Sequence, residues 1–178
     1  DHEELTARAF NALINDIDWD SSGQYLASID ENGVLQVFQS MDENSQLTEV
    51  LVRQPEAGIS LNSLAWAPDG TELATASANG WIAIWSLDGD VSAPGFQNAR
   101  HLHGHTESVT AVSWDASGHY LASIDESGHL IVWDASLGQR LVDKVLEENP
   151  VDIQWSPVHP VLAIVDRNSN LSIWGLEL

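Results

Sequence analysis

The chain has 178 residues, and 27 acidic side chains against six lysines and arginines give it a formal net charge of −21. A field of this sign repels nucleic acid and anionic membrane surfaces, so basic proteins and peptides are the favoured partners. No residue is cysteine, which excludes a disulfide framework, cysteine-based zinc sites and thiol catalysis. No apolar stretch approaches the ~20 residues of a membrane span and the first residues do not form a signal peptide, so we expect a cytoplasmic or nuclear protein without a cofactor.

Residues 1–13 fit two secondary structures. Their composition, rich in Glu, Leu and Ala, favours a helix on propensity alone. Residues 5–10, however, lie as far ahead of Trp19 as the apolar stretch 141–146 lies ahead of Trp155. The second stretch is expected to be an outer strand, so position favours a strand for residues 5–10.

Two repeating units follow, at about 14–54 and 59–105. Each contains three short apolar runs of strand composition, bounded by Gly, Ser and Asn. Asn32-Gly33 and Asn79-Gly80 separate the second run from the third, and Asn-Gly is a strong signal for a β-hairpin. Each unit is therefore predicted to be an antiparallel meander.

A third unit lies at about 106–146 and a fourth at about 150–178. The third gives the clearest pattern. Its strands are expected at 109–114, 120–124, 130–133 and 141–146. In the fourth unit Ser169 replaces the glycine of the second hairpin turn, and the chain stops after the third strand.

The four units share one register. The first tryptophan of each unit is followed 19 residues later by the aromatic residue of the third strand. These pairs are Trp19–Phe38, Trp66–Trp85, Trp114–Trp133 and Trp155–Trp174. A constant spacing inside the unit, with variable spacing between units, predicts a fixed structural unit joined by loops of different length. We interpret the tryptophans as packing groups between units rather than as cofactor contacts.

The third unit carries a family resemblance. Gly104-His105 opens it, residues 121–128 read LASIDESG, and Trp133-Asp134 closes it. These residues resemble the WD40 repeat, and the shared register extends the resemblance over essentially the whole chain. The resemblance implies an all-β fold in which four repeats each form a four-stranded antiparallel sheet, the blade of a β-propeller. It also implies a non-catalytic scaffold for protein–protein interaction.

Three architectures are compatible with four blades: a compact ring, an eight-blade ring made by two chains, and half of a larger propeller. WD40 proteins are known to close their ring with an N-terminal strand, so residues 5–10 are expected to complete the unit at 150–178. Exposed sheet edges favour assembly with other blades. Two functional alternatives stay open. One is membership of a multisubunit complex, for example in chromatin or replication, because the fourth unit resembles blades of such proteins; the other is an enzyme using the central channel.

The resemblance implies a buried hydrogen-bond network in the third unit. WD40 repeats often join the histidine of Gly-His, a hydroxyl of the second strand, a turn aspartate and the tryptophan of the third strand. His105, Ser123 and Trp133 match this pattern, whereas Ser127 occupies the aspartate position, so the network is expected to be incomplete. A His-Ser-Asp set also occurs in hydrolases, but the chain has no G-x-S-x-G elbow, which favours the structural interpretation.

His101, His103 and His105 alternate along one predicted strand. Alternate residues of a strand point to one face, so three imidazoles could bind zinc or nickel. Against this, His105 already has a structural role and one strand rarely brings three rings to one ion. We therefore predict no metal site, with these histidines as the weak candidates.

Acidic residues recur in the turns and loops expected at one edge of the propeller. They are Asp30, Glu31, Glu107, Asp125, Glu126, Asp152 and Asp166. We expect them to form an acidic face that receives a basic peptide. The same charge also fits a solvated surface that keeps the protein soluble, or adaptation to high salt.

Overall fold

The computed structural model describes residues 10–40, 47–86, 99–147 and 149–176. These residues form fifteen strands and no helix, which confirms the all-β class. In chain order the strands are β1 (Ile14–Trp19), β2 (Tyr25–Asp30), β3 (Leu35–Ser40), β4 (Leu47–Arg53), β5 (Leu61–Trp66), β6 (Glu72–Ser77), β7 (Trp81–Ser86), β8 (Arg100–His103), β9 (Val109–Trp114), β10 (Tyr120–Asp125), β11 (His129–Asp134), β12 (Gln139–Val145), β13 (Pro150–Trp155), β14 (Val161–Asp166) and β15 (Leu171–Gly175).

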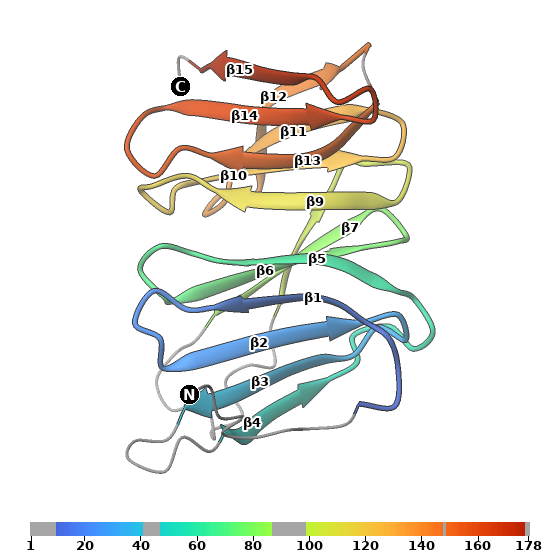
Figure 1. Ribbon diagram of the computed structural model, residues 1–178, viewed down its shortest axis with the longest axis vertical. Coiled ribbons are helices and arrows are strands. Elements are labelled where there is room, and N and C mark those ends of the chain that lie inside the picture. Colours follow the sequence, from blue (N-terminus) through green and yellow to red (C-terminus); the bar gives the residue numbers. More distant parts are fainter. Residues whose placement is uncertain (1–9, 41–46, 87–98, 148, 177–178) are drawn as a thin grey trace, which may run out of the picture.

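The strands pair into four antiparallel sheets, each built from consecutive strands (Figure 1). β1–β4, β5–β8 and β9–β12 form three four-stranded sheets, and β13–β15 form the fourth sheet within the described residues. The predicted strand at residues 5–10 lies outside the described residues except for Phe10. The ring of Phe10 packs edge-on against Phe38 of β3, with 6.2 Å between ring centroids. Phe10 therefore lies at the first sheet and not at the fourth.

The turn between the second and third strands of each sheet needs a left-handed residue. Gly33, Gly80 and Gly128 fill this position with φ values of 81°, 87° and 85°. A side chain at Gly33 would also collide with the next loop, because an added Cβ would lie 2.3 Å from the carbonyl oxygen of Ile59. In the fourth sheet Ser169 adopts a φ of 64°. For a residue with a Cβ this conformation costs roughly 1–2 kcal/mol.

The four sheets are stacked in chain order (Figure 1). β1 lies beside β5, β5 beside β9 and β9 beside β13. The first sheet lies at one end of the stack and the fourth at the other. The sheets therefore form an open arc rather than a compact four-blade ring.

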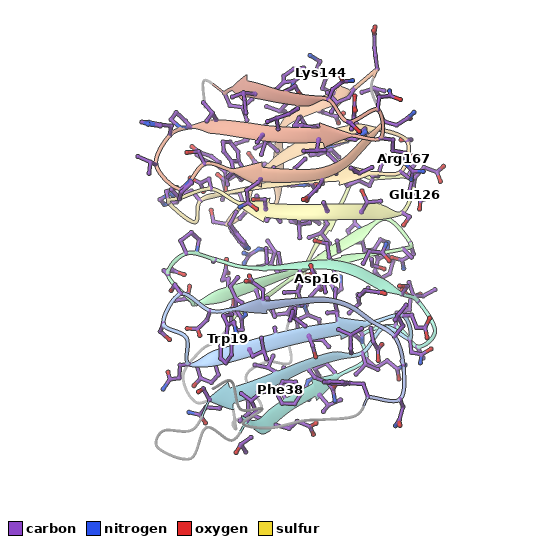
Figure 2. The ribbon with its side chains drawn as sticks, viewed as in Figure 1. Asp16, Trp19, Phe38, Glu126, Lys144 and Arg167 are labelled. Atoms are coloured by element: carbon purple, nitrogen blue, oxygen red, sulfur yellow. The ribbon has the colours of Figure 1, made fainter. Side chains whose placement is uncertain are left out.

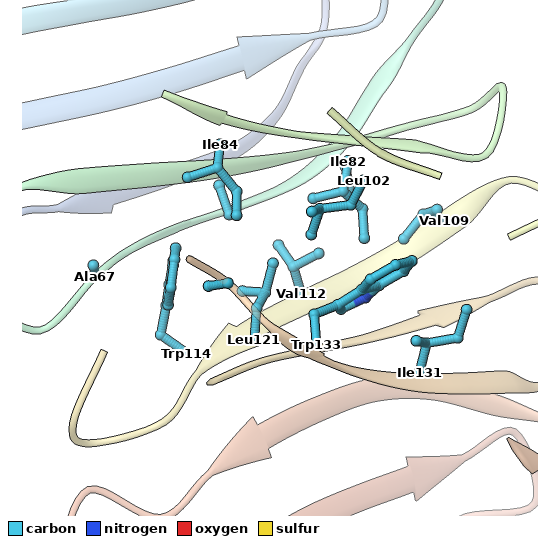
Figure 3. Packing of buried hydrophobic residues seen from close by; sticks show 13 residues of the cluster. Ala67, Ile82, Ile84, Leu102, Val109, Val112, Trp114, Leu121, Ile131 and Trp133 are labelled. Carbon is cyan, nitrogen blue, oxygen red and sulfur yellow. The ribbon is translucent and has the colours of Figure 1, made fainter. Parts of the chain in front are cut away.

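Each pair of neighbouring sheets encloses its own hydrophobic core. In the core between the second and third sheets, Trp114 and Trp133 meet Ile82 and Ile84 (Figure 3). Each inner sheet thus has a leading face, packed on the preceding sheet, and a trailing face, packed on the following one. In the third sheet the leading face is formed by Val109, Val112, Trp114, Leu121 and Trp133, and the trailing face by Ala122, Ile124, Leu130 and Val132. Full burial of each large apolar side chain stabilises such a core by roughly 1.5–3 kcal/mol.

Candidate functional site

Three of the predicted acidic-face residues are buried turn carboxylates. Asp30, Asp125 and Asp166 each end the second strand of a sheet and have relative exposures of 7%, 0% and 5%. Asp30 Oδ1 accepts backbone N–H groups at 2.9 and 2.8 Å, and Asp166 Oδ1 does so at 2.8 and 2.9 Å. Hydrogen bonds from Asn170 hold the pKa of Asp166 below its ordinary value. These carboxylates stabilise their own turns, so a partner would find little of them at the surface.

Exposed glutamates occupy the same edge of the arc. The turns after the second strands bond to the segments that lead into the first strands of the same sheets, as in Glu126 N–H to Ser108 O at 2.9 Å and Arg167 N–H to Asn149 O at 3.0 Å. Figure 2 places Glu126 and Arg167 at this edge. We name its exposed glutamates the acidic rim: Glu31, Glu56, Glu107, Glu126 and Glu147.

The acidic rim differs from the predicted face in its members. Glu31, Glu107 and Glu126 were expected from the sequence, whereas Glu56 and Glu147 were not. Their positions could have indicated this, because Glu56 and Glu147, like Glu107, lie in the loop that connects the fourth strand of one sheet to the first strand of the next. Asp152 is exposed, but it lies on β13 and lines a groove at the arc's inner strands instead.

The third sheet contains a continuous buried hydrogen-bond chain. Trp133 Nε1–H donates to Ser123 Oγ at 2.8 Å, and Ser123 Oγ lies 2.7 Å from His105 Nε2. His105 Nδ1 lies 2.9 Å from Asp125 Oδ2, with both side chains fully buried. The expectation of an incomplete network with Ser127 at the aspartate position was wrong, because Asp125 reaches the histidine. Ser127 instead donates to Asp125 Oδ1.

The protonation of this chain follows from its surroundings. Burial lowers the pKa of His105 against the opposing effect of Asp125, so the ring is neutral with its proton on Nδ1. Burial also disfavours ionised Asp125, but hydrogen bonds from Ser127, His105 and His129 hold its pKa below the ordinary value. The chain of donors therefore runs from Trp133 through Ser123 and His105 to a carboxylate.

The three histidines proposed as weak metal ligands do not gather. The rings of His101 and His103 stack at 6.2 Å and flank Trp81 at 5.6 and 5.3 Å. His105 turns away into the buried chain. Among the described residues, His105, Asp125 and His129 do place ligand atoms within 4.8 Å of one another. Both ring nitrogens of His105 are already hydrogen-bonded, so this group serves the fold.

The first strands of the four sheets line a groove of about 550 Å³. Asp16 and Asp18 of β1 lie in it, and each uses Oδ2 to accept a backbone N–H of β5, at 2.9 and 3.0 Å. Burial raises the pKa of Asp18, and the charges of Asp16 and Asp20 add to this effect. These carboxylates cross-link two sheets, which is a structural use of the groove's acids.

Comparisons with known proteins agree with this geometry. The family model described as WD domain, G-beta repeat matches residues 50–86 and 96–134. The solved RRP9 WD40 repeats superpose with a TM-score of 0.80 at 15% identity, over 95% of this chain and 50% of that one. Residues 50–86 and 96–134 therefore match WD40 repeats, and the described chain shares the fold of the solved WD40 repeats.

Among curated WD40 relatives, the F-box-like/WD repeat-containing protein TBL1X of Mus musculus is 31% identical over 96 residues, which is 53% of this chain and 17% of that protein. The ribosome biogenesis protein WDR12 homolog of Drosophila erecta is 25% identical over 185 residues, covering 96% of this chain and 43% of that protein. The chain thus spans less than half of each relative.

WD40 propellers are typically non-catalytic scaffolds for interactions in multiprotein complexes. The Ser123–His105–Asp125 set fits that rule, since Ser123 is fully buried and its oxygen accepts the tryptophan N–H. A hydrolase nucleophile must be accessible to its substrate. The part of the chain that the structure describes also contains no helix long and apolar enough to cross a membrane.

The neutral histidine of this WD40 network predicts a pH dependence of stability. Its folded pKa is lowered from 6.5, so as pH falls below about 6.5 the unfolded state takes up a proton that the folded state refuses. The stabilisation is present above that pH and is lost below it, by up to about 1.4 kcal/mol per pH unit. Urea unfolding from about pH 7.5 to 5.5 should show a steeper loss for wild type than for His105→Gln. Parallel curves for the two proteins would contradict a neutral His105.

Proposed function

We propose that this chain is a non-catalytic interaction scaffold whose acidic rim binds a basic segment of a partner protein. The observation that carries the proposal is the gathering of five exposed glutamates on one edge of the arc. The fold uses the buried aspartates of this edge in its turns. The glutamates project beyond them, so their charge is available to a ligand.

Electrostatics supports a basic ligand and disfavours several others. A rim of one charge sign on a chain of net charge −21 attracts lysine- and arginine-rich segments and accelerates their association. It repels nucleic acid and anionic membranes, and no cofactor is part of the proposal. The names of the relatives, which refer to ribosome biogenesis and to WD repeats with an F-box-like region, support an intracellular multiprotein complex.

The rim can be tested with charge-matched variants. Glu107→Gln/Glu126→Gln removes two rim charges, and Glu49→Gln/Asp69→Asn removes two exposed charges elsewhere. A fluorescein-labelled Lys/Arg-rich peptide should bind the rim variant about fivefold more weakly at low salt, since each exposed pair contributes roughly 0.2–1 kcal/mol. The control variant should bind like wild type, and wild-type binding should weaken as NaCl is raised.

Two results would count against the rim. Equal losses in both variants would show that overall charge, and not this edge, attracts the peptide. Unchanged binding by the rim variant, with unfolding midpoints equal to those of wild type, would place the binding surface elsewhere.

A further inference from the structure

The trailing face of the fourth sheet is exposed where its counterparts are buried. Three apolar residues, on the second and third strands, make this face in the first three repeats: Ile29, Leu35 and Val37 in the first sheet, Ala76, Ile82 and Ile84 in the second, and Ile124, Leu130 and Val132 in the third. All nine have relative exposures of 0% or 1%. The equivalent Val165, Leu171 and Ile173 of the fourth sheet are 38%, 66% and 62% exposed.

The leading face of the first sheet is exposed in the complementary way. Ile17 and Trp19 of β1 have relative exposures of 59% and 47%. Their equivalents are buried: Leu64 and Trp66 in the second sheet, Val112 and Trp114 in the third, and Ile153 and Trp155 in the fourth, all at 2–6%. The chain thus presents one uncovered face of each kind, at opposite ends of the arc (Figure 1).

Hydrogen bonds between sheets show what each uncovered face is built to meet. Trp66 Nε1–H donates to Asp18 O at 3.1 Å, and Trp114 Nε1–H donates to Ala65 O at 3.0 Å. Trp155 Nε1 in the fourth sheet is buried without a partner, so the bond forms at two of the three contacts between sheets. On the pattern of those two contacts, Trp19 would donate to a carbonyl of a sheet ahead of it, and the equivalent carbonyl belongs to Gln154.

The acceptor side repeats as well. Asp16 uses Oδ1 for the N–H of Ile17 and Oδ2 for the N–H of Leu64 in the next sheet. Asp152 is its equivalent in the fourth sheet, and its Oδ1 accepts the N–H of Ile153 in the same way, at 2.9 Å. In a second copy the equivalent of the Leu64 N–H is that of Ile17, which donates to its own Asp16 Oδ1 and would be shared with Asp152 Oδ2.

We propose that a second copy of this chain covers both faces, with the first sheet of each copy seated on the fourth sheet of the other. Each copy carries both halves of the contact, so two such contacts related by a twofold axis leave neither face uncovered. The chain covers 50% of the solved RRP9 WD40 repeats at a TM-score of 0.80, so one copy supplies about half of a propeller. Eight sheets lie within the usual range of ~4–8 blades.

Pairing would also complete the groove. Its walls are the first strands of the four sheets. A second copy would turn the groove into a central channel lined by Asp16, Asp18 and Asp152 of both chains. Each copy has a net charge of −21, so association should strengthen with salt, because salt screens the repulsion. Peptide binding at the acidic rim has the opposite salt dependence, so the two proposals can fail separately.

Light scattering on the eluting protein tests the pairing. At ~1 M NaCl the mass should be twice the chain's 19.4 kDa, and at ~0.05 M NaCl it should fall towards that of one chain. Ile173→Lys changes a side chain that is 62% exposed in the single chain, so the arc should fold while the mass stays at 19.4 kDa. Leu137→Lys, at a position 66% exposed between β11 and β12 of the inner third sheet, should pair like wild type.

Cross-linking identifies the faces, because the chain has no cysteine of its own. Inside the arc, Leu64 and Val37 belong to one core. Leu64 is the counterpart of Ile17, and Val37 is the counterpart of Ile173. Ile17→Cys mixed with Ile173→Cys should therefore cross-link with a short bismaleimide, whereas Ile17→Cys mixed with Leu137→Cys should not. A single-chain mass at both salt concentrations, pairing by Ile173→Lys, or growth into longer open assemblies would each overturn the proposal.

Discussion

Asp125→Ala is expected to lower the free energy of unfolding by about 3–4 kcal/mol. The substitution removes the acceptor of the buried His105 N–H and of the turn N–H groups of Ser127 and His129. These donors lie in or beside the core, where water does not replace the lost partner. Urea unfolding followed by tryptophan fluorescence measures the change.

Asp166→Ala is the matched control for this loss. Asp166 holds the equivalent turn of the fourth sheet through Asn168 and Asn170, and it bonds to no histidine within the described residues. We expect a smaller loss, of about 1–2 kcal/mol, because turn donors near the surface regain water. Equal losses for the two variants would mean that the contact between His105 and Asp125 adds nothing to stability.

Trp133→Ala is expected to cost about 3–5 kcal/mol. The indole is 1% exposed at the centre of the second core, and its loss leaves a cavity facing Ile82 and Leu102 (Figure 3). It also removes the N–H that bonds Ser123. Thermal and urea unfolding should both report the loss.

Trp81→Ala provides the comparison for Trp133. Trp81 is 41% exposed and packs against the rings of His101 and His103 on the neighbouring strand β8. Its replacement should cost less than about 1 kcal/mol, as is usual for exposed positions. A loss as large as that of Trp133→Ala would show that burial between sheets does not govern the contribution of these tryptophans.

The first sheet naturally lacks the indole N–H that Trp133 supplies in the third sheet. Phe38 occupies the position of Trp133, and Ser28 occupies that of Ser123. Phenylalanine has no N–H, and Ser28 Oγ is buried without a hydrogen-bond partner. The first sheet nevertheless keeps this position buried, because the Phe38 ring is only 2% exposed and fills the space that the indole fills in the third sheet. Packing between sheets is therefore enough to keep this position buried without the polar chain.

Much of the fold was predictable from the sequence because its signals are local. The spacing from Trp114 to Trp133 and the Asn-Gly turns specify strand length and register, and β9–β12 lie where they were expected. An open arrangement was among the three architectures considered, but the sequence alone did not decide between them, since closure depends on small rotations between sheets that no residue pattern records.

The candidate site was predicted less well, for a reason that Asp125 illustrates. Asp125 and Glu126 are adjacent acids in one turn, and the sequence treats them alike. In the structure Asp125 turns inward to His105 and three turn donors, while Glu126 points to solvent. Which of two neighbouring carboxylates is buried depends on the pleat at the end of β10, where register shifts by a bulge. Positions could be proposed from the sequence, but not their exposure.

The three separate cores have a consequence for how the chain loses its structure. Each sheet packs only on its immediate neighbours, so the two inner sheets are packed on both faces and the two outer sheets on one face. Local unfolding should therefore start at the first and fourth sheets and then spread to the two inner sheets. The polar chain around Trp133 belongs to an inner sheet, and it would be among the last contacts to let water in.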